Sequence, residues 1–458
     1  MKGCANVWLW AWHAFTLTMP IGVSSNGFAV APVHEWTRQL GTTQRDEGTA
    51  VAVDRFGNVF LAGFTDGKFG PPDNMSSSTD MFISKFDTNG HGLWTNQIRE
   101  SNANDFIHDL AFDNDGSLFV GGHSYVIDGG DGSSGEGDLF PPVSESTVRK
   151  LGHQGTPLWT ATSYGSSIHA LDVDGIGNVF ATGFSGDGIA DDAQRDVLLN
   201  KFSSSGALIW TASLASSEDE EALAVNVDDL GNVFIAGYTR GKLGPTRLGN
   251  LDAFIAKYDD RGNLAWKSQF GTTHHDMSQA LAADGLGNVY VTGYLGAPVN
   301  PVGCLVKYDS LGGVLWTQEI ESLWRETDKA IAVDAEGNVY LAGSKAASGN
   351  GANVQADVLL SKFDPDGKLL WNHSMGSAED DLVSGLALDG LGNIYIAGKT
   401  LGNLGESHFG DYDAFLAKVH DPTAATHVIP EPRSLLIGGL VAAASLALYR
   451  SRAVKLHG

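Results

Sequence analysis

Cysteine is nearly absent from this chain of 458 residues, which has only two, at Cys4 and Cys304. We expect the N-terminal segment that holds Cys4 to be removed, and Cys304 would then have no partner for an intramolecular disulfide bond. We expect Cys304 to be a small buried hydrophobe. Charged residues make up only 18% of the chain, and 29 basic residues face 54 acidic ones, giving a net charge of −25. Such an acidic surface repels nucleic acid, so we expect no nucleic-acid partner.

The chain also lacks the common linear motifs of catalysis. It contains no Gly-x-Ser-x-Gly elbow, no HExxH helix, no P-loop and no Gly-x-Gly-x-x-Gly after a strand. Two Asp-x-Asp-Gly segments, at Asp113 and Asp364, resemble the start of a calcium loop but lack its closing Glu, so we interpret them as turns. We therefore assign no catalytic residue, no metal site and no cofactor, and we leave calcium open.

One phrase, Asp-x-x-Gly-Asn-Val-Phe/Tyr-x-Ala/Thr-Gly, is repeated along the chain with small changes. Copies begin at Asp54, Asp174, Asp228, Asp284, Asp334 and Asp389, and a looser copy begins at Asp113. Seven copies spaced about 50–60 residues apart indicate a repeat architecture. In such a protein each repeat buries its surfaces only against its neighbours, so the length of the chain does not require one large core.

Each repeat offers four strand-like runs. In the first run bulky apolar residues alternate with alanine, as in Val51, Ala52 and Val53, which predicts a strand with one thin face near a crowded axis. The repeated phrase, a run such as Asp252–Tyr258 and a run ending in Trp follow in turn. Four strands in each of seven repeats, with no helical periodicity, predict an all-β protein: a seven-bladed β-propeller of four-stranded antiparallel blades.

The Trp-containing strands predict how the ring closes. The first of them, around Trp36, precedes the first repeat, whereas the last repeat ends after its third strand at Val419. We therefore expect the Trp36 strand to pair into the last blade, which protects two edges that would otherwise pair with other chains. A lysine that we expect to pair with a nearby carboxylate recurs in every third strand. These lysines are Lys85, Lys150, Lys201, Lys257, Lys307, Lys362 and Lys418.

The repeats resemble the bacterial SBBP-type β-propeller repeats, through their Gly-Asn-Val-Tyr-x-Ala-Gly and Asp-Ala-Phe-x-Ala-Lys-Tyr signatures. The resemblance covers about residues 34–420, and the second repeat departs most, with Ser117 in place of Asn. It implies the propeller fold, which we place at residues 32–422. It implies no particular chemistry, because this family has no single established activity.

The N-terminus differs from the repeats. Lys2 is followed by an apolar, Trp-rich stretch from Val7 to about Val23 and then by small polar residues, a pattern typical of a secretory signal peptide. We assign residues 1–31 to this signal and expect export and cleavage by signal peptidase. The cleavage point is either after Ala31, where Pro32 should hinder it, or after Ala29.

The C-terminal part of the chain, 423–458, has three features in a fixed order. They are the Pro430-Glu431-Pro432 motif, the apolar segment 434–449, and the pair Arg450 and Arg452. The apolar segment is short for a full bilayer span. The order closely resembles the PEP-CTERM sorting signal of Gram-negative bacteria. The resemblance implies transient anchoring by a transmembrane helix in the inner membrane, recognition by an exosortase-type protease, and delivery to the cell surface, outer envelope or extracellular matrix. A plain tail anchor is the alternative.

Strand alternation places short, regular turns on one face of the propeller and variable loops on the other. The variable-loop face also receives a repeated acidic position, eight residues before the Asp that ends each first strand. This position holds Asp46, Asp105, Glu220, Asp276, Glu326 and Asp381, with Ser166 in the third repeat. One hypothesis is a ring that attracts cations or binds polyols at the mouth of the channel. The alternative is that each carboxylate accepts hydrogen bonds as a structural staple.

Three polar residues break the symmetry of the thin face. Asp109, Asp172 and Asn226 stand in consecutive repeats where the other repeats mostly have alanine. They form a second candidate site, for a small polar ligand or an ion at the channel wall. Ordinary hydration of the channel is the alternative.

Together these features predict an exported protein of the cell surface or extracellular matrix. We expect a non-catalytic binding or display module, which meets an exopolysaccharide or a surface protein through its variable loops. Two alternatives stay open: a hydrolase or lyase that acts on extracellular glycans through carboxylates near the channel, and a purely structural envelope protein. Two carboxyl groups about 5–10 Å apart would favour the enzyme.

Overall fold

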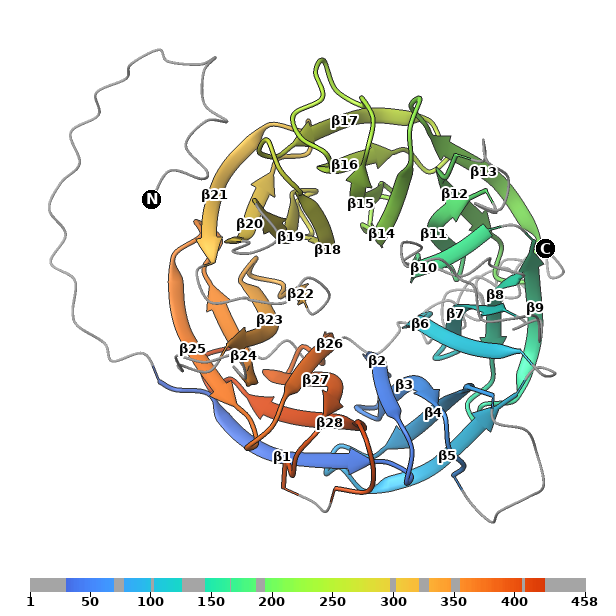
Figure 1. Cartoon of the computed structure of the whole chain (residues 1–458), viewed down its shortest axis with the longest axis vertical. Helices are drawn as coiled ribbons and strands as arrows, with labels where there is room; N and C mark the ends of the chain where they lie inside the picture. Colours follow the sequence, from blue (N-terminus) through green and yellow to red (C-terminus); the bar gives the residue numbers. More distant parts are fainter. Residues whose placement is uncertain are drawn as a thin grey trace, which may run out of the picture.

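The computed structural model shows a ring of β-sheets (Figure 1). It describes residues 30–69, 78–99, 103–125, 145–164, 166–186, 194–296, 302–320, 329–346, 355–405 and 408–424. Within these ranges the chain forms 28 strands in seven four-stranded antiparallel sheets and no helix. The predicted all-β, seven-bladed propeller is therefore confirmed. The signal segment and the Pro430-Glu431-Pro432 tail lie outside the described residues, and no described helix is long and apolar enough to cross a membrane.

Every blade is built from an inner strand, two middle strands and an outer strand. The inner strands are β2 (Asp46–Val53), β6 (Asn104–Phe112), β10 (Ser166–Val173), β14 (Glu220–Val227), β18 (Met277–Ala283), β22 (Lys329–Val333) and β26 (Asp381–Leu388). The second strands are β3 (Val59–Thr65), β7 (Leu118–Tyr125), β11 (Val179–Ser185), β15 (Val233–Thr239), β19 (Val289–Leu295), β23 (Val339–Ala346) and β27 (Asn393–Thr400). The third strands are β4 (Asp80–Phe86), β8 (Glu145–Leu151), β12 (Asp196–Phe202), β16 (Asp252–Tyr258), β20 (Val302–Tyr308), β24 (Ala356–Phe363) and β28 (Asp413–His420). The outer strands are β5 (Gly92–Ile98), β9 (Pro157–Ser163), β13 (Leu208–Leu214), β17 (Leu264–Phe270), β21 (Val314–Ile320), β25 (Leu369–Met375) and β1 (Val33–Leu40).

The first strand of the chain completes the last blade, as the count of Trp strands predicted. β1 lies beside β28 in the sheet order β1-β28-β27-β26, so the blue and red ends of the described chain meet in one blade (Figure 1). Trp36 stands opposite Lys418, the same pairing that Trp94 makes with Lys85 in the first blade. The N-terminal strand therefore occupies the position that a hairpin-connected strand occupies in the other six blades.

The turns between inner and second strands explain the repeated phrase. In the first blade, Asp54 Oδ1 accepts the backbone N–H groups of Phe56 and Asn58, each at 2.9 Å, and Asn58 Nδ2 donates to Asp54 Oδ2 at 2.7 Å. Gly57 adopts a φ of +79°, which strongly favours glycine. The Asp and Asn of the phrase therefore hold a turn that its Gly permits, and this turn returns from blade to blade.

Seven hydrophobic clusters form the core, and each of them joins two neighbouring blades. Between blades, the outer-strand Trp packs against a glycine in the next blade's turn, as Trp36 does on Gly90. A Cβ on Gly90 would lie 2.9 Å from the Trp36 ring, so only glycine fits there. The Trp210 ring N–H and the Lys201 ammonium both donate to the Asp260 carbonyl of the next blade, at 3.0 and 3.2 Å. Neighbouring blades are thus locked by packing and by hydrogen bonds.

The end of the propeller uses a different lock. Because the third strand of the last blade, β28, is not followed by a hairpin, Lys362 of the sixth blade meets a carboxylate: its Nζ lies 2.7 Å from Asp421 Oδ2. Tyr340 also donates to this oxygen, at 2.9 Å. Both side chains of the ion pair are at most 2% exposed. Burial alone would raise the pKa of Asp421, but hydrogen bonds from Lys362, Thr423 and Tyr340 outweigh it and lower the pKa.

We predict that Asp421→Ala destabilises the ring, because it leaves the buried Lys362 ammonium without its carboxylate. Loss of one partner of a buried pair costs about 3–5 kcal/mol. The double variant Lys362→Met/Asp421→Ala should recover part of this loss, as measured by urea unfolding. Since the pKa of Asp421 is lower in the folded state, the stabilisation is present above the ordinary Asp pKa and is lost as the pH falls through the folded-state value. Equal stability of Asp421→Ala and wild type would contradict this lock.

Candidate functional site

The repeated acidic position lies where the chain enters each blade. Glu220 is fully buried and accepts the Ser216 N–H and hydroxyl, both at 2.6 Å, and the Thr239 hydroxyl at 2.5 Å. Asp46, Asp276 and Asp381 are equally buried and accept the N–H and hydroxyl of the residue four positions earlier. Each of these carboxylates therefore fixes the connection from the preceding blade to its own inner strand.

The remaining members of the acidic set differ in what the structure describes. Asp105 is also fully buried, at the start of β6. In the third repeat Ser166 replaces the carboxylate and forms hydroxyl–hydroxyl hydrogen bonds with Ser146 and Ser163, each at 2.9 Å. Glu326 lies outside the described residues. This geometry favours the structural-staple interpretation, because Asp46, Glu220, Asp276 and Asp381 are fully buried and accept hydrogen bonds from their own loops.

Burial also changes the proton affinity of these carboxyl groups. It raises the pKa of Asp46 to about 6, against the opposing effect of hydrogen bonds from Thr65 and Thr42. Burial raises the pKa of Glu220, Asp276 and Asp381 in the same direction. Within the described residues, no group of three or more His, Cys, Asp or Glu side chains could hold a metal ion.

The three thin-face residues link the inner strands of consecutive blades. Asp109 Oδ2 accepts the N–H of Leu171 on the third blade at 3.0 Å, and Asp172 Oδ2 accepts the Asn226 amide and the Val227 N–H of the fourth, each at 2.8 Å. Asn226 Oδ1 in turn accepts the Ala283 N–H of the fifth blade at 2.9 Å. These side chains therefore form a chain of hydrogen bonds between the inner strands of blades two to five, which we call the thin-face relay. Their oxygens accept hydrogen bonds from the wall of the channel.

This relay gives no support to a hydrolase or lyase that uses channel carboxylates. Burial raises the pKa of Asp109 to about 7 and the pKa of Asp172 to about 6, while backbone hydrogen bonds act in the opposite direction. The proton affinity would suit an acid catalyst, but each carboxylate already holds the neighbouring inner strand. A general acid must be free to reach its substrate.

A different set of residues lines the channel, and the period-two pattern of the sequence did not predict it. The register of the inner strand shifts in six blades, for example between Gly48 and Ala50, so that one residue forms a β-bulge. The bulged residues are Thr49, His108, His169, Leu223, Gln279 and Ser384. All six line a channel cavity of about 200 Å³, together with the thin-face alanines. Counting with a strict period of two hides such a residue, although its variation from repeat to repeat is visible in the sequence.

Two of the bulged residues belong to a histidine cluster between blades two and three. His108 Nε2 lies 2.8 Å from His123 Nδ1, and the two rings stack with centroids 4.8 Å apart. The His169 ring lies 5.6 Å from His108. Burial lowers the pKa of all three imidazoles to about 3, so they are neutral at ordinary pH. A neutral imidazole offers one hydrogen-bond donor and one acceptor.

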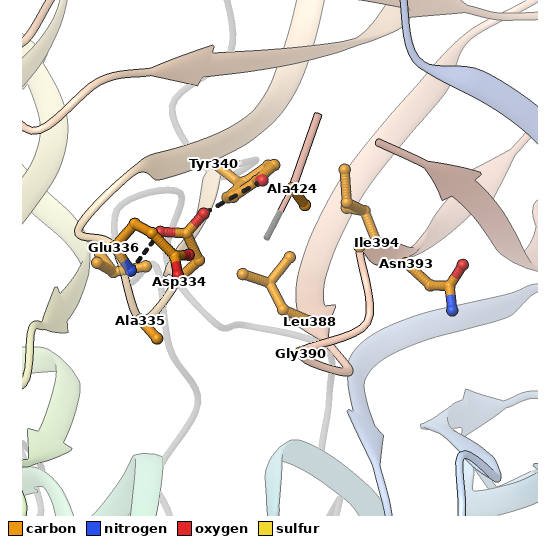
Figure 2. A pocket seen from close by; sticks show the side chains of 11 residues that line it. Asp334, Ala335, Glu336, Tyr340, Leu388, Gly390, Asn393, Ile394 and Ala424 are labelled. Carbon is orange, nitrogen blue, oxygen red and sulfur yellow. Dashed lines mark hydrogen bonds between the residues drawn. The ribbon is translucent and has the colours of Figure 1, made fainter. Parts of the chain in front are cut away.

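A second pocket, of about 200 Å³, lies between the sixth and seventh blades on the turn face (Figure 2). Tyr340 and Asp334 line it on one side, and Leu388 and Ile394 on the other. Ala424, the last residue before the undescribed tail, closes its edge. The Tyr340 hydroxyl donates to Asp334 Oδ2 at 3.4 Å as well as to Asp421, so the polar side of this pocket belongs to the lock of the last blade.

The other sequence-based expectations have clear outcomes. Four of the seven third-strand lysines pair with a carboxylate, and the other three donate to carbonyl groups of the next blade, as Lys418 also does. All seven also lie over the aromatic ring of their own second strand. Cys304 is buried, as predicted. Asp113 and Asp364 begin turns, closed by the N–H groups of Gly116 and Gly367.

Seven four-stranded blades arranged in a ring, the last of them completed by β1, define a seven-bladed β-propeller repeat protein. The SBBP family model, a beta-propeller repeat, matches two segments of it, residues 35–70 and 376–406. The first segment contains the closing strand β1, and the second contains the inner and second strands of the same blade. The sequence signatures and the family model therefore agree on a propeller repeat.

The chain resembles several known proteins, among them two curated proteins and two solved structures. An uncharacterised WD repeat-containing protein of Acanthamoeba polyphaga mimivirus is 22% identical over 305 residues, 59% of this chain and 18% of that protein. Regulatory protein FlaEY of Caulobacter vibrioides is 28% identical over 109 residues, 22% of this chain and 11% of that protein. The chain thus spans less than a fifth of either relative.

The WD40 β-propeller domain of Doa1 is 12% identical, with a TM-score of 0.49, covering 85% of this chain and 97% of that one. A protein of unknown function from Dyadobacter fermentans is 11% identical, with a TM-score of 0.49, covering 86% and 99%.

We predict that Asp109→Asn changes how stability depends on pH. The folded carboxyl titrates near pH 7 and the unfolded one near 4, so the folded state holds more protons between these values and stability falls as the pH rises. Relative to wild type, Asp109→Asn should gain about 3 kcal/mol of unfolding free energy between pH 4 and pH 7.

Urea unfolding at several pH values measures this difference. The channel histidines titrate in both proteins and drop out of the comparison. Asp229→Asn, at an exposed position in a turn, is the matched control and should stay parallel to wild type at every pH. A constant difference between Asp109→Asn and wild type would contradict the raised pKa of Asp109.

Proposed function

We propose that this propeller is exported by a Gram-negative bacterium and acts on the cell surface or in the extracellular matrix as a non-catalytic binding module for an exopolysaccharide or a surface protein. The observation that carries the proposal is the contrast between the two faces of the ring. Connections on the turn face are short, as at 54–58 and 87–91. On the variable-loop face only residues 296–301 separate β19 from β20, whereas residues 126–144 separate β7 from β8. Variable connections on a rigid scaffold are the usual place for recognition.

The two faces also differ in their exposed apolar side chains. On the variable-loop face Leu248 is 40% and Phe409 is 48% exposed. On the turn face, the tips of the turns after the inner strands carry a separate set, which we call the turn-tip ring. It consists of Phe56, Ile176, Leu230, Leu286 and Leu391. This arrangement permits a matched test of which face binds.

The ends of the chain support export. The signal-peptide pattern of residues 1–31 and the Pro-Glu-Pro, apolar and arginine pattern of residues 423–458 are the two signals expected of a surface protein of this type. Signal peptidase and an exosortase-type protease would be its processing partners. The propeller would contact the membrane only through the tail before processing.

We predict that replacing Pro430, Glu431 and Pro432 by Ala keeps the unprocessed protein in the inner membrane of an exosortase-containing host. Wild type should be recovered from the cell surface or the matrix, and cell fractionation with an antibody against the propeller distinguishes the two outcomes. Replacing Pro365 by Ala, in a turn of the propeller, is the control and should leave delivery unchanged. Normal delivery of the triple variant would contradict the sorting proposal.

We predict that the mature protein binds polysaccharides of its own host's matrix on an array, with binding weakened at least tenfold by Leu248→Ser/Phe409→Ser. The paired control Leu286→Ser/Leu311→Ser removes two apolar side chains from the turn face that are more exposed, at 82% and 84%, and should bind as wild type does. Measurements with and without calcium test whether binding depends on this ion.

Loss of binding only in the control pair would move the interface to the turn face and contradict the proposed one. Absence of binding to any polysaccharide would reject a polysaccharide ligand, leaving a surface protein or a purely structural role. Release of shortened glycans by the wild-type protein would overturn the non-catalytic part of the proposal.

A further inference from the structure

We propose that the six bulged residues form a binding site for one polyhydroxylated ring the size of a monosaccharide, such as the terminal sugar of a polysaccharide chain. This inference rests on the proposed function for its source of ligand. The site lies within the channel and is separate from the loops on the variable-loop face. It is built by Thr49, His108, His169, Leu223, Gln279 and Ser384.

The geometry of the inner strands creates the site. In a regular strand, side chains alternate between the two faces, and the channel would be lined by the thin face alone. A bulge adds one residue and re-aims its side chain. The shift recurs at the same place in six blades, so six added side chains meet around one cavity. Alanines flank the bulge in several blades, for example Ala50 and Ala280, and leave the space open.

The size of the cavity limits the ligand. About 200 Å³ corresponds to the liquid volume of about six or seven water molecules, at about 30 Å³ each. This space is large enough for a single sugar ring, so the terminal residue of a polymer would fill it. The channel would then recognise chain ends, while the surface loops would contact the rest of the polymer.

The chemistry of the lining is that of a neutral, hydrogen-bonding ligand with one apolar side. Ser384 offers a hydroxyl and Gln279 an amide group. The Thr49 hydroxyl donates to the Ile107 carbonyl at 2.7 Å, so its oxygen is left to accept a hydrogen bond. His108 Nε2 is paired with His123, and the neutral imidazole of His169 adds further polar nitrogen atoms. Leu223 faces them from the fourth blade. A sugar ring has a matching division between its hydroxyl edge and its C–H face, and pockets that bind small molecules combine apolar walls with a few placed polar groups.

Gln279 is the most direct indication of a ligand. Its side-chain oxygen is buried and accepts no hydrogen bond from the described residues. Burying a polar group without a partner is unfavourable, so native proteins rarely leave one unsatisfied. The thin-face relay is different, because Asp109, Asp172 and Asn226 all have hydrogen-bond partners within the wall. Rotation of the Gln279 side chain into the channel would expose this oxygen, and a ligand hydroxyl that donates to it would then complete its hydrogen bonding.

Charge favours neutral sugars over acidic ones. Asp109 and Asp172 lie in the same wall, and the chain as a whole carries a large excess of acidic residues. An anionic ligand would be repelled by this field. A uronic acid nevertheless shares the hydroxyl pattern, and both kinds of sugar belong in the experiment.

The test is titration of the mature protein with single neutral sugars and with the matching uronic acids, followed by calorimetry or ligand-observed NMR. Gln279→Leu keeps the volume of the side chain and removes its hydrogen bond, and it should weaken binding of the preferred sugar about tenfold. Gln318→Leu makes the same change on the outer strand β21 of the same blade and is the matched control. It should bind as wild type does.

A second variant protects the test against a folding defect. Leu223→Phe places a larger side chain in the cavity and makes it smaller, without removing a polar group. It should prevent the sugar from binding. Thermal unfolding monitors the integrity of all three variants.

Binding of a sugar that is equally strong in both channel variants and in wild type would overturn the channel site. Failure of every single sugar to bind, or to compete with a polysaccharide that the protein does bind, would also overturn it and would leave the proposed surface function intact. If no polysaccharide binds either, the proposed ligand class fails as well.

Discussion

The contact between one blade and the next is the constraint on which this structure depends. No blade has a core of its own, since each of the seven hydrophobic clusters draws its residues from two neighbours. The same dependence explains the repeated Trp, Lys and Gly, because Trp210 and Lys201 both reach the turn at Asp260 of the following blade. Because every blade shares its core with its neighbours, the ring must close, or the apolar surfaces of the first and last blades would stay exposed to water.

The fold could be predicted from the sequence almost completely, and the reasons are local. The repeated phrase encodes a turn whose Asp, Gly and Asn act within five residues. One surplus Trp strand at the start of the count and one missing outer strand at its end leave one solution for closure. The candidate site was less predictable. Asp109 and Asp172 were recognised as exceptions, but their partners, the N–H groups of Leu171 and Val227, lie on other blades and carry no mark in the sequence.

The bulged residues that line the channel could not be predicted from the period of two. A period of two predicts which side chains of a strand share a face only while the register holds, and one extra residue at Thr49 or Gln279 breaks it. In six described inner strands the added residue also differs in kind from its neighbours. The residues next to the bulge are mostly small or apolar, whereas the added residue is Thr, His, Leu, Gln or Ser. A symmetric scaffold thereby acquires an asymmetric channel.

Closure by β1 sets the order in which the molecule can be completed. Val33 at the start of the described fold pairs with His420 near its end, so the first strand to be synthesised has no partner until the last one exists. In a chain made from its N-terminus, β1 has no strand partner while six blades assemble in sequence. The final pairing then seals the first and last blade interfaces in one step. A chain that stops before β28 would leave the edge of β1 unpaired and exposed.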